Sequence, residues 1–146
     1  MNIYKGIQID APNIFVPWAI SENKLVELFK GKNLKHITEG YDTIKCSLFN
    51  GLNCIVGFHF DSRLNGHISE FEFFRSNYDD QQGSFDEFQK YFVQTFGMPT
   101  ITTPGYEGFN NHEWIFDNIK IIHLVYDRFG PEEHMRIKYM PLHSKA

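Results

Sequence analysis

Residues 52–74, LNCIVGFHFDSRLNGHISEFEFF, hold two strand patterns on either side of Asn65-Gly66. An Asn-Gly pair between apolar runs of alternating pattern is a strong short-range signal for a β-hairpin. A two-residue turn at this pair predicts that Phe60 lies opposite Phe71. The phenylalanines of both strands would then share one apolar face, which we interpret as the core of the protein.

Two amphipathic helices are predicted, one on each side of this hairpin in the sequence. The first follows an N-cap at Ser21 and ends before Gly31. The second begins at Ser84, because Ser84 and Glu87 have the spacing of a capping box, and ends at Gly97. Both helices are expected to cover the aromatic face of a sheet.

Each predicted helix is followed by three strand patterns, so the order helix, strand, strand, strand occurs twice. The patterns are YDTIKCSLF, LNCIVGFHFD and HISEFEFF, and then NHEWIFD, IKIIHLVYD and EHMRIKYM. We therefore predict an α+β fold in which two tandem α-β-β-β units form an antiparallel sheet with the helices packed on one face. Residues 1–146 would make a single domain with pseudo-repeat halves at about 14–75 and 84–140, joined by a polar linker at 76–83. The segment IYKGIQI, residues 3–9, is predicted to be an edge strand.

The composition favours a folded domain and argues against nucleic acid and membranes as partners. The 146 residues are 42% hydrophobic and 22% charged, with 15 phenylalanines, which excludes a disordered chain. A net charge of −4 without runs of Lys and Arg argues against nucleic-acid binding. No apolar stretch approaches the roughly 20 residues that span a bilayer, and the N-terminus lacks the apolar part of a signal peptide. We expect a cytoplasmic protein with no membrane contact.

Two short motifs resemble a family of small bacterial modules. FVPWAISENKLVELF, residues 15–29, resembles the "PWG-S" helix entry of α-β-β-β modules of the BamE and β-lactamase-inhibitor-protein type, with Ala19 where those modules often have Gly. YFVQTFGMP, residues 91–99, resembles their "lGxP" helix exit. The resemblance implies a binding protein, such as an inhibitor, an assembly factor or an intracellular immunity protein whose partner is a toxin. It implies no catalytic residue and no cofactor.

Alternation along the strands predicts a second, polar face of the sheet. Phe71 and Ile137 would point toward the helices, so their sequence neighbours point away from them. The resulting candidate partner-binding residues are His59, Asp61, Arg63, Glu70, Glu72, Arg136 and Lys138. This face is expected to be exposed, acidic in the first half and basic in the second. Its charges suit either a polar interface or a solvated surface that keeps the protein soluble.

The alternative function is a small metal-dependent hydrolase. His112, His123 and His134 are equally spaced, and a two-residue Asp117-Asn118 turn would set His112 opposite His123. Imidazoles at that distance could share zinc with a third ligand. The candidates for this third ligand are Asp127 and Glu113. Histidines on a polar sheet face without a metal are the competing interpretation.

Two further groups of chemically active residues have ordinary structural interpretations. In VYDRFGPEEHMRI, residues 125–137, Glu133 and His134 could form an acid/base pair, but the segment is also typical of a hairpin whose carboxylates are solvated at the tip. A three-residue loop at 49–51 places Cys46 opposite Cys54 on the core face. We interpret these cysteines as free buried thiols.

Overall fold

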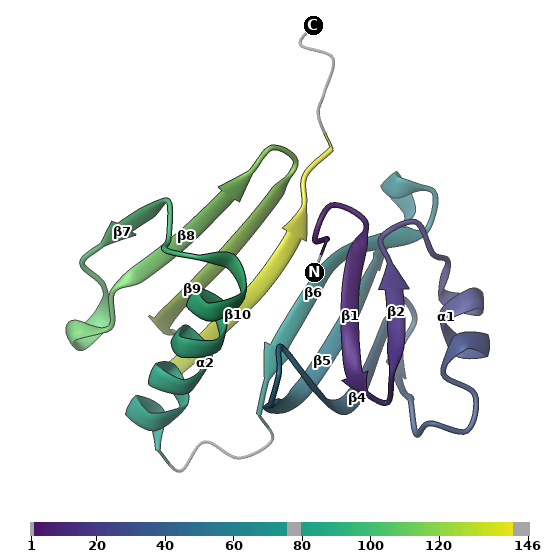
Figure 1. Cartoon of the computed structure of the whole chain (residues 1–146), viewed down its shortest axis with the longest axis horizontal. Coiled ribbons are helices and arrows are strands. Elements are labelled where there is room, and N and C mark those ends of the chain that lie inside the picture. Colours follow the sequence, from purple (N-terminus) through teal and green to yellow (C-terminus); the bar gives the residue numbers. More distant parts are fainter. Residues whose placement is uncertain (1, 76–79, 142–146) are drawn as a thin grey trace, which may run out of the picture.

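The computed structural model describes residues 2–75 and 80–141, in which ten strands form one antiparallel sheet (Figure 1). The strands are β1 (Gly6–Ala11), β2 (Ile14–Pro17), β3 (Lys35–Thr38), β4 (Tyr41–Leu48), β5 (Leu52–Asp61), β6 (His67–Phe74), β7 (Ile101–Thr103), β8 (Asn111–Phe116), β9 (Ile119–Asp127) and β10 (Pro131–Tyr139). The α-helices are α1 (Glu22–Leu28) and α2 (Gln81–Phe96), and two short 3-10 turns are η1 (Ser62–Leu64) and η2 (Tyr106–Gly108).

The sheet joins two three-stranded meanders through their last strands. Its order is β2-β1-β4-β5-β6-β10-β9-β8-β7, with β3 paired to β4 on the side of β4 that also carries β1. Where β6 meets β10, Phe71 lies opposite Ile137 and Glu72 lies opposite Arg136. The path of the sheet ends at two short strands, β2 and β7.

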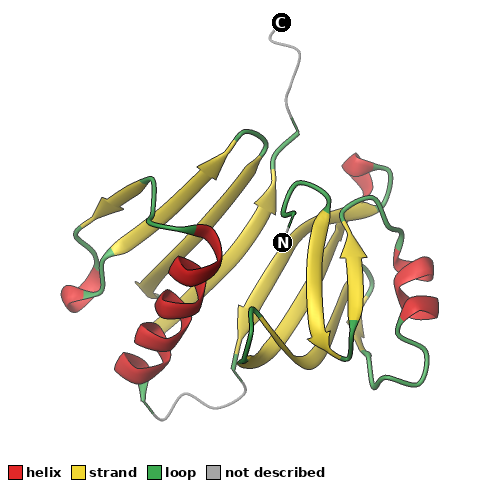
Figure 2. Cartoon of the chain, viewed as in Figure 1, coloured by secondary structure: helices red, strands yellow, loops and turns green. Residues whose placement is uncertain are grey.

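The predicted α+β fold of two tandem α-β-β-β units with helices packed on one face is wrong. The protein is β-rich, and among the described residues it has two α-helices, of which α1 is seven residues long. A helix of two turns cannot cover the aromatic face of β5 and β6. The N-terminal segment, expected to be a single edge strand, instead folds as the β1–β2 hairpin (Figure 2).

The β1–β2 hairpin covers the first half of the apolar face. Ile7, Ile9 and Val16 are fully buried in the same cluster as the aromatic residues of β5 and β6. Trp18, which follows β2, packs its ring 4.4 Å from that of Phe71 and donates a hydrogen bond to the carbonyl of Ile3. The hairpin therefore covers the part of the apolar face that the first helix was predicted to cover.

Helix α2 covers the second half of the apolar face. Phe92 is fully buried, and its ring lies 5.4 Å from Phe73 and 6.0 Å from Trp114. The helix starts earlier than predicted: Asp80 is its N-cap and accepts a hydrogen bond from the amide of Gly83. Ser84 consequently lies inside the helix. The last three residues of the predicted linker, 81–83, belong to the helix as well. Residues 76–79 of that linker lie outside the described residues.

The N-cap of the first helix is confirmed, because the Ser21 hydroxyl accepts from the amide of Lys24 at 3.3 Å. Two strand registers are confirmed as well. Cys46 lies opposite Cys54, with both thiols free and buried. His112 lies opposite His123.

The register predicted for the first hairpin is wrong by two residues. Phe58, not Phe60, lies opposite Phe71. The turn is longer than Asn65-Gly66 because η1 precedes it, and the register shifts again between His59 and Phe60. Since side chains alternate with a period of two, a two-residue shift keeps Phe58 and Phe71 on the predicted face.

Neither helix in the described part of the chain is long and apolar enough to cross a membrane.

Replacement of Ile9 by alanine tests whether the hairpin is a part of the core. Ile9 is fully buried, so the loss of its side chain should lower the free energy of unfolding by about 2–5 kcal/mol. Phe15 of the same hairpin is 40% exposed, and Phe15→Ala should change stability by less than about 0.5 kcal/mol. Urea unfolding measures both, and equal small losses would contradict the packing of β1 on the sheet.

Candidate protein-binding face

One face of the sheet carries α2 and the β1–β2 hairpin (Figure 2), and the other face is here called the open face. The residues of the open face are half-buried or exposed. They are Tyr41, Ile55, His59, Glu70, Glu72, Phe74, Ile115, Lys120, Ile122, Leu124, His134, Arg136 and Lys138. They follow from the strand registers, because residues directly opposite one another in neighbouring strands share a face.

A network of paired charges occupies the middle of the open face. The Arg136 guanidinium donates hydrogen bonds to Glu70 and, at 3.2 Å, to Glu72. The other oxygen of Glu72 lies 2.8 Å from Nε2 of His59. The network spans β5, β6 and β10, so it fixes three neighbouring strands to one another.

The predicted exposure of these charges is wrong. The side chains of Glu70, Glu72 and Arg136 are 16%, 23% and 23% exposed. Burial alone would raise the pKa of Glu72, but the hydrogen bond from His59 and the charge of Arg136 hold that pKa below its usual value. The acidic and basic halves neutralise each other across β6 and β10 instead of facing a partner as separate charges.

Tyr41 extends the network onto β4, although it is not among the predicted partner-binding residues. Its ring stacks on His59 at 4.4 Å, and its hydroxyl donates to Glu72 at 3.3 Å. Burial and the charge of Glu72 raise the pKa of Tyr41 to about 12. The ring lies over Gly57, where a Cβ would come within 2.8 Å of it. The confirmed register of Cys46 opposite Cys54 sets Tyr41 opposite His59, so the sequence did hold the signal that locates this tyrosine.

Hollows lie on both sides of the network. A groove of about 820 Å³ runs beside β4 and is lined by Ile37, Tyr41, Ile55 and Phe74 among others. On the other side of Phe74, a smaller hollow of about 260 Å³ contains His134 and Arg136. Both hollows mix apolar with charged side chains: the groove also contains Lys32, Lys35 and Lys45, and the smaller hollow also contains Glu132.

The remaining predicted partner-binding residues lie at one end of this face. Asp61, Arg63, Glu70 and Lys138 line a third hollow of about 450 Å³. Arg63 donates to Asp61 within this group, and that hydrogen bond lowers the pKa of the Asp61 carboxyl. Lys138 lies opposite Glu70 in the sheet. All seven predicted residues thus belong to a connected region.

The histidines proposed as metal ligands are not brought together. The rings of His112 and His123 are 6.3 Å apart on the core side, whereas His134 lies on the open face. Glu113, one candidate for the third ligand, pairs with Lys120 at 2.9 Å. The other candidate, Asp127, is exposed at the end of β9.

His123 and Glu133 form a fully buried pair beneath α2. Nε2 of His123 lies 2.6 Å from Glu133, and its Nδ1 lies 2.7 Å from Oε1 of Gln89. The Ser84 hydroxyl donates to the second oxygen of Glu133 at 2.7 Å. The prediction that Glu133 is solvated at a hairpin tip is therefore wrong, and the proposed acid/base partner His134 lies on the opposite face. The pair anchors α2 to β9 and β10.

No protein-family model matches the chain, and no curated protein and no solved structure matches it either.

Substitution of Arg136 by methionine tests the network. Two half-buried carboxylates would lose their partner, so unfolding should become easier by about 1–3 kcal/mol. Arg63→Met is the matched control, because the Arg63 side chain is 88% exposed, and it should leave the urea midpoint unchanged. Equal midpoints for the two variants would show that the network does not stabilise the sheet.

Glu133→Ala should destabilise the protein more than Glu132→Ala, although the two glutamates are neighbours in β10. It leaves His123 and Ser84 buried without their partner, at a cost of about 3–5 kcal/mol. Glu132 is exposed, so Glu132→Ala should have little effect on thermal unfolding. A small effect of Glu133→Ala would mean that Glu133 is solvated after all.

Proposed function

We propose that this chain is a non-enzymatic protein-binding domain that engages its partner through the open face. The observation that carries the proposal is the hydrogen-bonded network of His59, Glu70, Glu72 and Arg136 on an uncovered sheet face. Beside it runs a groove in which apolar side chains such as Ile37 and Ile55 are mixed with lysines. Polar groups mixed with apolar anchors are the composition of a protein interface that is not permanent.

The size of the open face suits a macromolecule. A stable protein interface covers about 800 Å² on each partner, and the open face extends over strands from β4 to β8. The central charges are already paired with one another. Their burial under a partner would therefore leave no charge unpaired. Affinity would then depend on apolar anchors at the rims, such as Ile37 and Ile115, which are 54% and 46% exposed.

The metal-dependent hydrolase is not supported by the placement of its residues. His123 already contacts Glu133 and Gln89 inside the core, and His134 lies on the other face of the sheet. A hydrolytic centre needs a substrate cavity and converging ligands. The histidines of the second half do not converge in this way.

An immunity or inhibitor role inside the cell is the specific form of the proposal, with a toxin or an enzyme as the partner. This form follows from the resemblance of the helix entry and exit to those of bacterial inhibitor modules. In such proteins an uncovered sheet face binds the partner, and we expect the open face to bind in the same way here.

Affinity capture with single substitutions tests the proposal. The tagged chain is used to isolate a partner from the source cell, and binding is then measured with the purified partner. Ile37→Glu and Ile115→Glu, at opposite sides of the open face, should each weaken binding by about tenfold or more.

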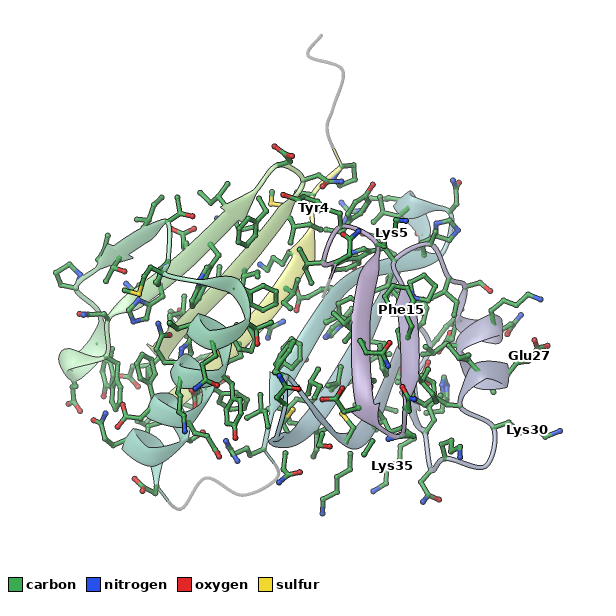
Figure 3. The ribbon with its side chains drawn as sticks, in the orientation of Figure 1. Tyr4, Lys5, Phe15, Glu27, Lys30 and Lys35 are labelled. Atoms are coloured by element: carbon green, nitrogen blue, oxygen red, sulfur yellow. The ribbon has the colours of Figure 1, made fainter. Side chains whose placement is uncertain are left out.

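The control substitution lies on the covered side of the sheet. Phe15 is exposed on β2, as Figure 3 shows, and Phe15→Glu should leave binding unchanged. Loss of binding in Phe15→Glu, with full binding in both variants of the open face, would place the interface elsewhere.

A further inference from the structure

A second cluster of reactive groups lies at the opposite end of the molecule from the His123–Glu133 pair. Glu22 begins α1, His36 is in β3 and Asp42 is in β4. One ligand atom from each residue lies within 4.8 Å of the other two. His36 lies directly opposite Asp42 in the sheet, and its Nδ1 is 2.7 Å from Asp42 and 3.4 Å from Glu22.

Two oxygens of this cluster are buried without a hydrogen-bond donor. They are Oε2 of Glu22 and Oδ2 of Asp42. The Asp42 side chain is fully buried, and within residues 2–75 and 80–141 neither carboxylate forms an ion pair with Lys or Arg. A buried oxygen without a donor is destabilising. The one group in the cluster that can carry positive charge is the His36 imidazole, which faces two carboxylates.

The two carboxyl groups also act on each other. One oxygen of Glu22 and one oxygen of Asp42 lie within 4.8 Å of each other. Two carboxylates that face one another over so short a distance must share a proton or hold a cation between them. A backbone hydrogen bond holds the Glu22 carboxylate in place, because the amide of Gly40 donates to its other oxygen at 3.2 Å. That amide orients the Glu22 carboxylate toward His36 and Asp42.

We propose that Glu22, His36 and Asp42 bind a divalent transition-metal cation of the zinc class. Ligand atoms at about 2.0–2.1 Å from a tetrahedral ion are about 3.3 Å from one another. The 3.4 Å between His36 and Glu22 fits this spacing. His36 and Asp42, which are 2.7 Å apart, would have to separate slightly. An imidazole nitrogen favours zinc over magnesium or calcium. The His36 side chain is 61% exposed, which leaves the fourth position of the ion to water.

The ion would join three segments of the first half of the chain. It would tie the first turn of α1 to β3 and β4, and the groove of the open face is lined by other residues of these two strands, such as Ile37 and Tyr41. The ion would therefore have a structural role, because it would fix the position of two strands that form part of the groove. The site stands independently of the proposed protein binding.

Calorimetric titration of ZnCl₂ into the chelator-treated full chain tests the site. We expect one zinc ion per chain and a dissociation constant at least tenfold weaker in His36→Ala and in Glu22→Gln. Asp42→Asn, which keeps the size of the buried side chain, should have the same effect. MgCl₂ should not displace the zinc.

Matched controls exist on the same helix and among the other histidines. Glu27 projects from α1 into solvent (Figure 3), and Glu27→Gln should leave zinc binding unchanged, as should His67→Ala. The proposal is overturned if no zinc binds, if His36→Ala and Glu22→Gln bind as the unmodified chain does, or if His36→Ala alone matters. It is also overturned if magnesium competes equally, because the imidazole would then not be a ligand.

Discussion

The pairing of β6 with β10 is the contact on which the rest of the molecule depends. It joins two meanders that are far apart in the sequence, and it sets Phe71 opposite Ile137 on one face and Glu72 opposite Arg136 on the other. A slip of one residue in either strand would turn its apolar side chains toward solvent and its charged ones toward the core. The continuous core and the charge network of the open face are therefore two results of the same register.

The sequence predicts the parts of the fold that are determined locally. The loop at 49–51 places Cys46 opposite Cys54, and the Asp117-Asn118 turn places His112 opposite His123, because short turns leave few alternatives for the strands that they join. The division of side chains between the two faces is also predictable. Side chains alternate with a period of two, so a register error of two residues leaves each side chain on its predicted face. The N-cap at Ser21 is another local signal that the structure confirms.

What the sequence does not predict depends on contacts between distant segments. Nothing in residues 6–17 indicates that they would fold over the sheet as a hairpin, because their short apolar runs suit an edge strand equally well. In the sequence, Glu133 has the neighbours of a loop carboxylate. Its burial depends on α2, which places Ser84 within hydrogen-bonding distance of it. Likewise Glu22, His36 and Asp42 have no motif spacing, and they meet because α1 and the β3–β4 hairpin converge in three dimensions.

The two ends of the sheet influence how copies of the chain behave toward one another. Unpaired N–H and C=O groups on an outer strand are a template to which another chain can add. Here β2 ends at Pro17, and β7 is three residues long between Pro99 and Pro104. Proline has no N–H to offer to an incoming strand. These two outer strands therefore offer little edge to which another chain could add.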